Sequence, residues 1–275
     1  MRRPRRRRLK GLPFNRMIPN ILTLLALCAG LTAIRFGLQE QWEYAVLAIM
    51  VAGIFDTLDG RVARLLKGAS RFGAELDSLS DFVCFGVAPM VLHYLWSMKD
   101  AGRIGWAVAL LFCVCCGLRL ARFNTLLDEP DAWPWTYKFF TGVPAPAGAG
   151  VVLLPMVLTF QIGTGFFDRP EVVGVFLVLA AGLLVSRVPT FSFKKFKVPN
   201  HLVLPTMLIV GLIAASMVSA PWATTSALLI AYLFSIPFSV RAYRRLEKVS
   251  LAARAEAEEE PAPVTLEIVA TSEDP

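Results

Sequence analysis

The sequence predicts an all-α, polytopic integral membrane helical bundle. Of its 275 residues, 56% are hydrophobic, and the mean hydropathy is +0.57. Soluble domains rarely have such a composition, and a membrane span needs about 20 mostly apolar residues. We therefore expect about eight transmembrane helices, at 18–38, 43–66, 75–97, 105–127, 142–163, 172–190, 201–219 and 222–241.

The distribution of basic residues predicts the orientation of these spans. With eight spans, the segments on the side of the N-terminus hold all but four of the 28 Lys and Arg residues. Because cytoplasmic segments carry the excess of positive charge in membrane proteins, we expect both termini to be cytoplasmic. The four exceptions are Arg35, Lys99, Arg103 and Arg169.

The two ends of the chain differ in composition from the apolar domain between them, which we place at 18–241. Segment 1–17 is basic and begins MRRPRRRRLK. Such a run can bind nucleic acid, but beside a membrane span it more simply contacts anionic lipid headgroups, so we expect no nucleic-acid partner. Segment 242–275 is rich in Glu and contains Pro261 and Pro263. We expect a short helical extension there that gives way to a disordered cytoplasmic tail.

The second and third spans are interrupted by charged and small residues at fixed spacing. They read Asp56-x2-Asp59-Gly60-x2-Ala63-Arg64-x8-Gly73-x3-Asp77-x3-Asp81. A carboxylate at the centre of a bilayer helix costs about 2.5–3.5 kcal/mol, and an intramembrane Asp is therefore a functional hypothesis by default. Four of them in one helical hairpin need a strong compensating charge.

Helical periodicity places these carboxylates on facing surfaces. Asp56 and Asp59 share one face of the second predicted span, and Asp77 and Asp81 are one turn apart on the third. Antiparallel packing would bring all four together near the cytoplasmic end. Two divalent cations would neutralise their charge, and hard oxygen ligands favour Mg²⁺ or Mn²⁺. Paired metals of this kind are well suited to phosphoryl transfer.

Other interpretations of the charged residues remain open at this point. The Asp cluster could be an inert ion-pair network that joins helices, although four Asp residues against one or two Arg fit this poorly. It could also conduct cations or relay protons in a transporter. The Cys113-x-Cys115-Cys116 cluster lacks the paired spacing of a zinc site, and we interpret these thiols as buried apolar side chains.

The eight-position pattern resembles the signature of the CDP-alcohol phosphatidyltransferases at every position. This family transfers a phosphatidyl or related group from a CDP-linked donor to an alcohol and releases CMP. Flanking segments are similar to the members that use L-serine as the acceptor. These segments are PNILT at 19–23, FGAELDSLSDFVCFGVAPM at 72–90, RLARFN at 119–124, FFTGVPAPAGAG at 139–150 and VPTFSFKKFKVP at 188–199.

The resemblance implies a role for each residue of the pattern. Asp56, Asp59 and Asp77 would be the main metal ligands, and Asp81 would join the second metal and act as general base. The remaining donor-binding residues would be Asn20, Thr23, Gly60, Ala63, Arg64 and Gly73, with Asp59 contacting the donor as well.

The resemblance also implies the substrates, CDP-diacylglycerol and L-serine, and a homodimer in the cytoplasmic membrane with its active site near the cytoplasmic face. Basic and polar residues at the end of the fourth span and after it could bind the serine carboxylate or the lipid phosphate. Arg pairs well with planar carboxylates, although such residues also anchor helix ends. Glycerol 3-phosphate and inositol phosphate remain alternative acceptors. The candidates are Arg119, Arg122, Asn124 and Lys138.

Overall fold

Helices lie at all eight positions where the sequence predicts a span. The computed structural model describes residues 17–66, 70–126, 139–186, 188–191 and 202–259. The first half contains α1 (Met17–Leu38), α2 (Trp42–Leu65), α3 (Arg71–Asp81), the π-helical turn η2 (Phe82–Val87), α4 (Ala88–Trp96), the 3₁₀ turn η3 (Met98–Ala101) and α5 (Gly102–Leu126). The second half contains β1 (Phe139–Thr141), α6 (Ala145–Ile162), α7 (Pro170–Val185), β2 (Pro189–Phe191), α8 (Val203–Ser219) and α9 (Pro221–Glu259).

Five helical segments of the described residues are long and apolar enough to cross a membrane. Two further helices, α7 and α8, are apolar but shorter. The second predicted span, α2, carries Asp and Arg residues in its C-terminal half and so lies outside this set. The chain therefore has the character of an integral membrane protein, and the count of eight spans stays a prediction.

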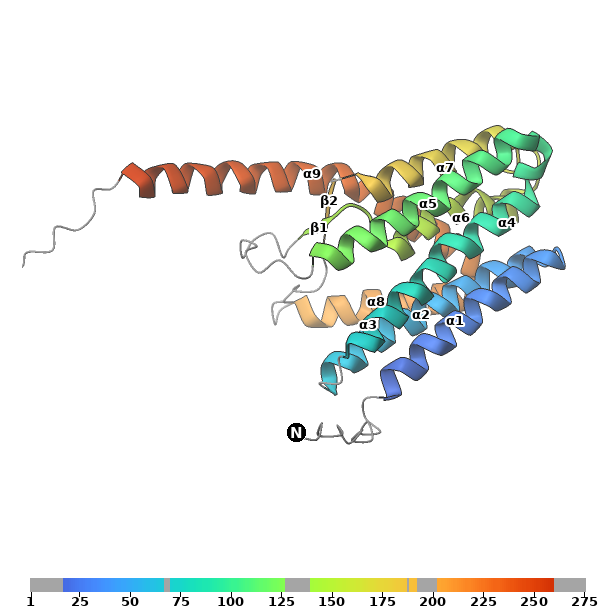
Figure 1. The fold of residues 1–275 in the computed structure, drawn as a ribbon, viewed down its shortest axis with the longest axis horizontal. Coiled ribbons are helices and arrows are strands. Elements are labelled where there is room, and N and C mark those ends of the chain that lie inside the picture. The colour runs from blue at the N-terminus through green and yellow to red at the C-terminus, as the bar shows by residue number, and fades with distance from the viewer. Residues whose placement is uncertain (1–16, 67–69, 127–138, 187, 192–201, 260–275) are drawn as a thin grey trace, which may run out of the picture.

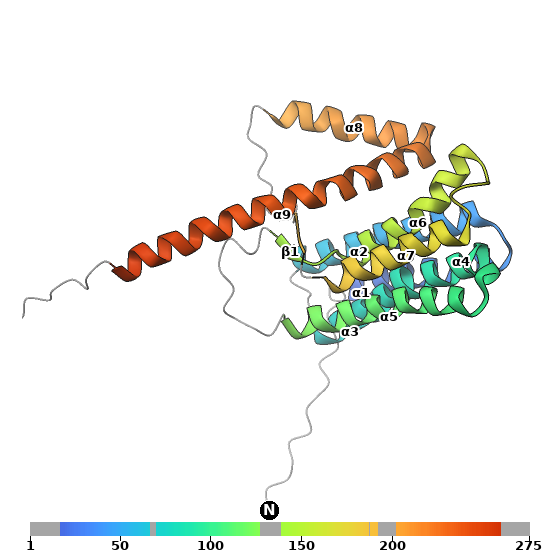
Figure 2. The same ribbon diagram turned by 90° about the horizontal axis from the view of Figure 1, so that it is seen from above.

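The most buried of the candidate membrane spans is α6, which contacts α2, α4, α5, α7 and α9 and has α7 beside it (Figures 1 and 2). Its small N-terminal residues let neighbours approach closely, since a Cβ added at Gly148 would lie 2.8 Å from the Leu184 side chain of α7. His93 of α4 is fully buried, and its Nε2 donates to the carbonyl of Val152 in α6 at 2.6 Å. This bond ties α4 to α6 and gives His93 a structural role. By contrast, α8 has no buried residue and packs mainly along α9 within the described part of the chain.

Two local features differ from the expected helices, and the last helix extends past its expected span. The strands β1 and β2 pair antiparallel, with Phe140 opposite Thr190, and add a small ladder to an otherwise helical chain. The predicted span 172–190 ends earlier, because α7 stops at Val185 and the chain then enters β2. Finally, α9 continues as far as Glu259, so the expected tail begins as a helix, while the 260–275 part of that prediction lies outside the described residues.

Candidate active site

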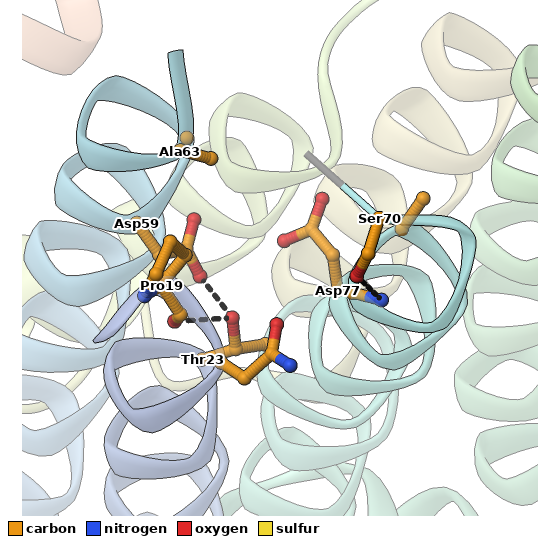
Figure 3. A pocket seen from close by; sticks show the side chains of 10 residues that line it. Pro19, Thr23, Asp59, Ala63, Ser70 and Asp77 are labelled. Atoms are coloured by element: carbon orange, nitrogen blue, oxygen red, sulfur yellow. Dashed lines mark hydrogen bonds between the residues drawn. The ribbon is translucent and has the colours of Figure 1, made fainter. Parts of the chain in front are cut away.

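The Asp residues of α2 and α3 converge as the helical spacing predicts. Carboxylate oxygens of Asp56, Asp59 and Asp77 all lie within 4.8 Å of one another. Asp59 is buried, and the other two are half-buried. In Figure 3 the side chains of Asp59 and Asp77 reach into the same space from opposite sides. Three converging carboxylates form a ligand set that could hold a divalent metal, and their oxygen donors suit Mg²⁺ or Mn²⁺ better than a soft metal.

Asp81 lies beside this triad but is not a member of it. It is the last residue of α3, one turn beyond Asp77, and the π-helical turn η2 follows at once. Its carboxyl group faces that of Asp56 within hydrogen-bonding reach, and both lie near the guanidinium of Arg119. Asp81 is thus placed between the triad and α5, where it could contact a second metal or a substrate hydroxyl. π-Helical turns often occur at functional sites.

A pocket of about 180 Å³ opens beside the triad between α1, α2 and α3. It contains five of the predicted donor-binding residues together with Asp59, whereas Arg64 is exposed and does not line it. Three further lining residues, Pro19, Ser70 and Ala74, were not proposed from the sequence, although Pro19 and Ala74 lie in segments that carried the resemblance. The pocket is lined by Pro19, Asn20, Thr23, Asp59, Gly60, Ala63, Ser70, Gly73, Ala74 and Asp77.

Small residues leave this pocket open. A Cβ added at Gly60 would meet no atom within 4 Å, so the space above its backbone is free for a ligand. At Gly73 the space is already taken, because an added Cβ would lie 2.8 Å from Oδ1 of Asn20 and 3.1 Å from Oγ of Ser70. Ser70 is the N-cap of α3 and accepts a hydrogen bond from the Gly73 amide at 3.0 Å. That cap fixes where α3 begins and hence where Asp77 points.

A threonine of α1 is attached directly to the triad. The Thr23 hydroxyl donates to Oδ2 of Asp59 at 2.6 Å (Figure 3). Both side chains are buried. The sequence placed Thr23 near the donor, and the structure places it in the pocket wall as well as against a candidate metal ligand.

The predicted acceptor residues of α5 lie on the other side of Asp81. Arg119 is partly buried beside Asp81 and Asp56, and its guanidinium carbon lies 5.7 Å from the centre of the Phe123 ring. Its Nε atom is buried and has no hydrogen-bond partner among the described residues. The positively charged Arg119 guanidinium could orient an anionic group of a substrate next to Asp81.

Two other acceptor candidates already have protein partners. The Arg122 Nη1 donates to the carbonyl of Val185 at the end of α7, at a long 3.4 Å. The Asn124 amide donates to Oγ of Ser78 in α3 at 2.9 Å. Asn124 therefore ties the end of α5 to the helix that carries Asp77 and Asp81. Lys138, the remaining candidate, lies outside the described residues.

Comparison with known proteins identifies the family of this chain. The model of the CDP-alcohol phosphatidyltransferase family matches residues 16–187, and that of CDP-alcohol phosphatidyltransferase 2 matches 201–237. The chain belongs to the CDP-alcohol phosphatidyltransferase family. The first match covers the triad, Asp81, the pocket and the acceptor candidates of α5.

Curated relatives cover most of the chain. A protein of Mycobacterium leprae is 41% identical over 244 residues, which are 89% of this chain and 80% of the relative. One of Mycobacterium tuberculosis is 40% identical over 230 residues, or 84% and 80% of the two chains. One of Helicobacter pylori is 36% identical over 181 residues, or 66% and 74%. Each of these relatives is named CDP-diacylglycerol–serine O-phosphatidyltransferase.

Proposed function

We propose that this chain transfers the phosphatidyl group from CDP-diacylglycerol to the hydroxyl of L-serine, giving phosphatidylserine and CMP. The class of reaction rests on the family and on the converging carboxylates beside an open pocket. The choice of serine rests on the names of relatives that are 36–41% identical over most of the chain.

The donor would lie in the pocket between α1, α2 and α3. The open backbone at Gly60 and the small side chain of Ala63 leave room for the flat cytosine ring, and Asn20 offers an amide to its polar edge. Arg64, exposed at the end of α2, would reach the donor phosphates from outside the pocket. The diphosphate would then face the carboxylates of the triad.

Asp56, Asp59 and Asp77 would hold one divalent cation, Mg²⁺ or Mn²⁺, and Asp81 would help to hold a second. When bound, such ions offset negative charge on the phosphoryl oxygens and on the departing CMP. The fit is chemical as well as spatial, because three carboxylates within 4.8 Å of one another repel unless a cation lies among them.

Asp81 would act as general base towards serine. It would accept the proton of the serine hydroxyl while that oxygen forms a bond to the phosphorus of the phosphatidyl group. The bond from this phosphorus to the CMP oxygen breaks at the same time, and CMP leaves with the electron pair. We favour this single displacement over a covalent phosphatidyl-enzyme.

Arg119 would orient the acceptor, since its guanidinium already lies next to Asp81. A bidentate pair with the serine carboxylate would bring the hydroxyl towards the base. Arg122 and Lys138 would add positive charge around this group, and Asn124 would act mainly by holding α5 against α3 through Ser78.

In the cell, the protein would lie in the cytoplasmic membrane as a homodimer with both termini in the cytoplasm. The excess of Lys and Arg on the side of the N-terminus supports this orientation. Asp56 and Asp59 of the triad lie in the C-terminal half of α2, whose following turn would be on that side, so the active site would open near the cytoplasmic face.

The first experiment is CMP release by the purified protein in detergent with CDP-diacylglycerol and Mn²⁺ or Mg²⁺. The acceptors are L-serine, glycerol 3-phosphate and inositol phosphate, each with and without a chelator. We expect release with serine alone and its loss with the chelator. Release with another acceptor would keep the reaction class and overturn the acceptor. No release with any acceptor, together with cation flux in proteoliposomes, would favour a transporter.

A further inference from the structure

The contact between Thr23 and Asp59 differs from an ordinary threonine contact in a helix. The Thr23 hydroxyl donates at 2.6 Å to a carboxylate oxygen of another helix, α2, and this acceptor lies 36 positions away in the chain. Only 4% of each residue's surface is exposed, so the bond is largely shielded from solvent. Asp59 is also the one buried member of the triad, and its orientation therefore depends on protein groups more than that of Asp56 or Asp77 does.

A second threonine on the same helix shows what the default contact would be. The Thr32 hydroxyl donates to the carbonyl of Cys28, four residues earlier, at 2.6 Å. Thr23 has the equivalent acceptor, the carbonyl of Pro19, at 3.1 Å. A hydroxyl has one proton, and at Thr23 the shorter contact is the one to Asp59. Thr23 thus donates its hydrogen bond mainly to Asp59 of α2 rather than to the backbone of its own helix.

The backbone of Thr23 is attached to the other Asp-bearing helix. Its carbonyl accepts a hydrogen bond from Oγ of Ser80 at 3.2 Å, and Ser80 is buried on α3 between Asp77 and Asp81. One residue of α1 therefore contacts both helices that form the triad. The side chain holds a carboxylate of α2, and the main chain holds the position of α3.

We propose that Thr23 is a positioning residue for the metal. It fixes Oδ2 of Asp59 and so directs the other oxygen of that carboxylate towards the space that Asp56 and Asp77 share. This inference rests on the proposed metal-dependent function, and it assigns Thr23 to the metal site rather than to nucleotide recognition. Groups that hydrogen-bond to metal ligands typically change metal affinity by about 10–100-fold when removed.

Mn²⁺ affinity of the purified protein tests this proposal, measured from the spin-resonance signal of free Mn²⁺ in the absence of any donor. Thr23→Val keeps the shape of the side chain and replaces its hydroxyl by a methyl group, which cannot donate a hydrogen bond. We expect about tenfold weaker Mn²⁺ binding. Thr23→Ser restores the hydroxyl and should bind within about twofold of the unaltered protein, because the hydrogen bond returns. Thr32→Val is the matched control and should leave Mn²⁺ affinity unchanged.

The outcomes separate the possible roles of Thr23. If Thr23→Val binds Mn²⁺ as the unaltered protein does but binds CDP-diacylglycerol more weakly at saturating Mn²⁺, Thr23 is a nucleotide contact and the proposal is wrong. Equal losses of Mn²⁺ affinity in the Val and Ser variants would also overturn it, since the hydroxyl would then be irrelevant. The readout does not need turnover, so failure of the serine reaction and failure of this inference can be told apart.

Discussion

Two pockets of equal volume lie along α2, and they differ in their position and in the chemistry of the residues that line them. The polar one, about 180 Å³, lies beside the C-terminal half of α2 and contains Asp59 and Asp77. The other, also about 180 Å³, lies beside the N-terminal half, between α2, η2, α6 and α9. It is lined by Val46, Ile49, Met50, Gly53, Phe85, Pro146, Ala149, Gly150, Leu153, Val157, Thr225 and Leu229.

The comparison teaches that donor atoms, rather than size, identify the site. In the apolar pocket Thr225 supplies the one hydroxyl, and the space arises where small residues of packed helices leave a gap. Such a space stays dry and binds only apolar groups. In the polar pocket, buried carboxylates are costly unless a cation or a hydrogen bond compensates them. The presence of such carboxylates in an apolar helix therefore indicates a function for them.

The largest effect should come from the carboxylate beside the polar pocket. Asp81→Asn keeps the size of the side chain but removes the base, and we expect turnover to fall by about 10²–10⁴-fold. Binding of CDP-diacylglycerol should change little, because Asp81 does not line the pocket. CMP release and donor binding would be measured separately.

Asp100→Asn is the control for this change, since Asp100 is an exposed carboxylate of η3 away from the triad. Near-normal turnover in Asp81→Asn would remove Asp81 from the role of base. A parallel loss of donor binding would instead make it a ligand of the metal that holds the donor.

A smaller effect is expected where a methyl group enters the polar pocket. In Gly73→Ala the new Cβ would lie 2.8 Å from Oδ1 of Asn20, so that amide has to move. Overpacking of this kind costs about 1–3 kcal/mol, and we expect about tenfold weaker binding of CDP-diacylglycerol. The measurement is the donor KM at saturating serine, with kcat less affected. An unchanged KM would mean that Asn20 does not contact the donor.

Arg122→Ala should have a still smaller and more selective effect. Because Arg122 is only half-buried, we expect a rise of about fivefold in the serine KM, or about 1 kcal/mol, while the donor KM stays constant. Arg122→Lys retains the charge, and its serine KM should lie between those of the unaltered protein and Arg122→Ala. If serine dependence is unchanged and only thermal stability falls, Arg122 acts through its bond to the Val185 carbonyl of α7.

The spacing of residues predicted the parts of the site that depend on one helix at a time. Positions 56 and 59 share a face by periodicity alone, and the triad forms as expected once α2 and α3 pack together. Helical spacing did not predict that Asp81 lies beside the triad rather than in it, because Asp77 and Asp81 share one face of α3. The π-helical turn at 82–87 was not predictable either, since its apolar sequence fits an α-helical or a π-helical path.

Contacts between helices that are far apart in the sequence could also not be predicted from local sequence patterns. Asn124 was proposed as an acceptor residue because it is polar and lies at the end of a span, yet its amide donates to Ser78, 46 positions earlier in the chain. Thr23 was placed in the pocket by resemblance, but nothing in the spacing indicated its bond to Asp59. The pairing of β1 with β2 likewise joins segments separated by two helices. Such partners are set by tertiary packing.

The smallest effect is expected for a methyl group in the apolar pocket, where Gly53→Ala is the counterpart of Gly73→Ala. Gly53 is on α2 only three positions before Asp56, but an added Cβ would lie 3.8 Å from the Phe85 ring, an ordinary van der Waals contact. Alanine is also the better helix former by about 1 kcal/mol. We expect a slightly higher melting temperature and donor and serine KM values within about twofold of the unaltered protein, because no polar group is displaced. If Gly53→Ala weakened donor binding as much as Gly73→Ala, the apolar pocket would contribute to the same substrate site, and the division between the two halves of α2 would be wrong.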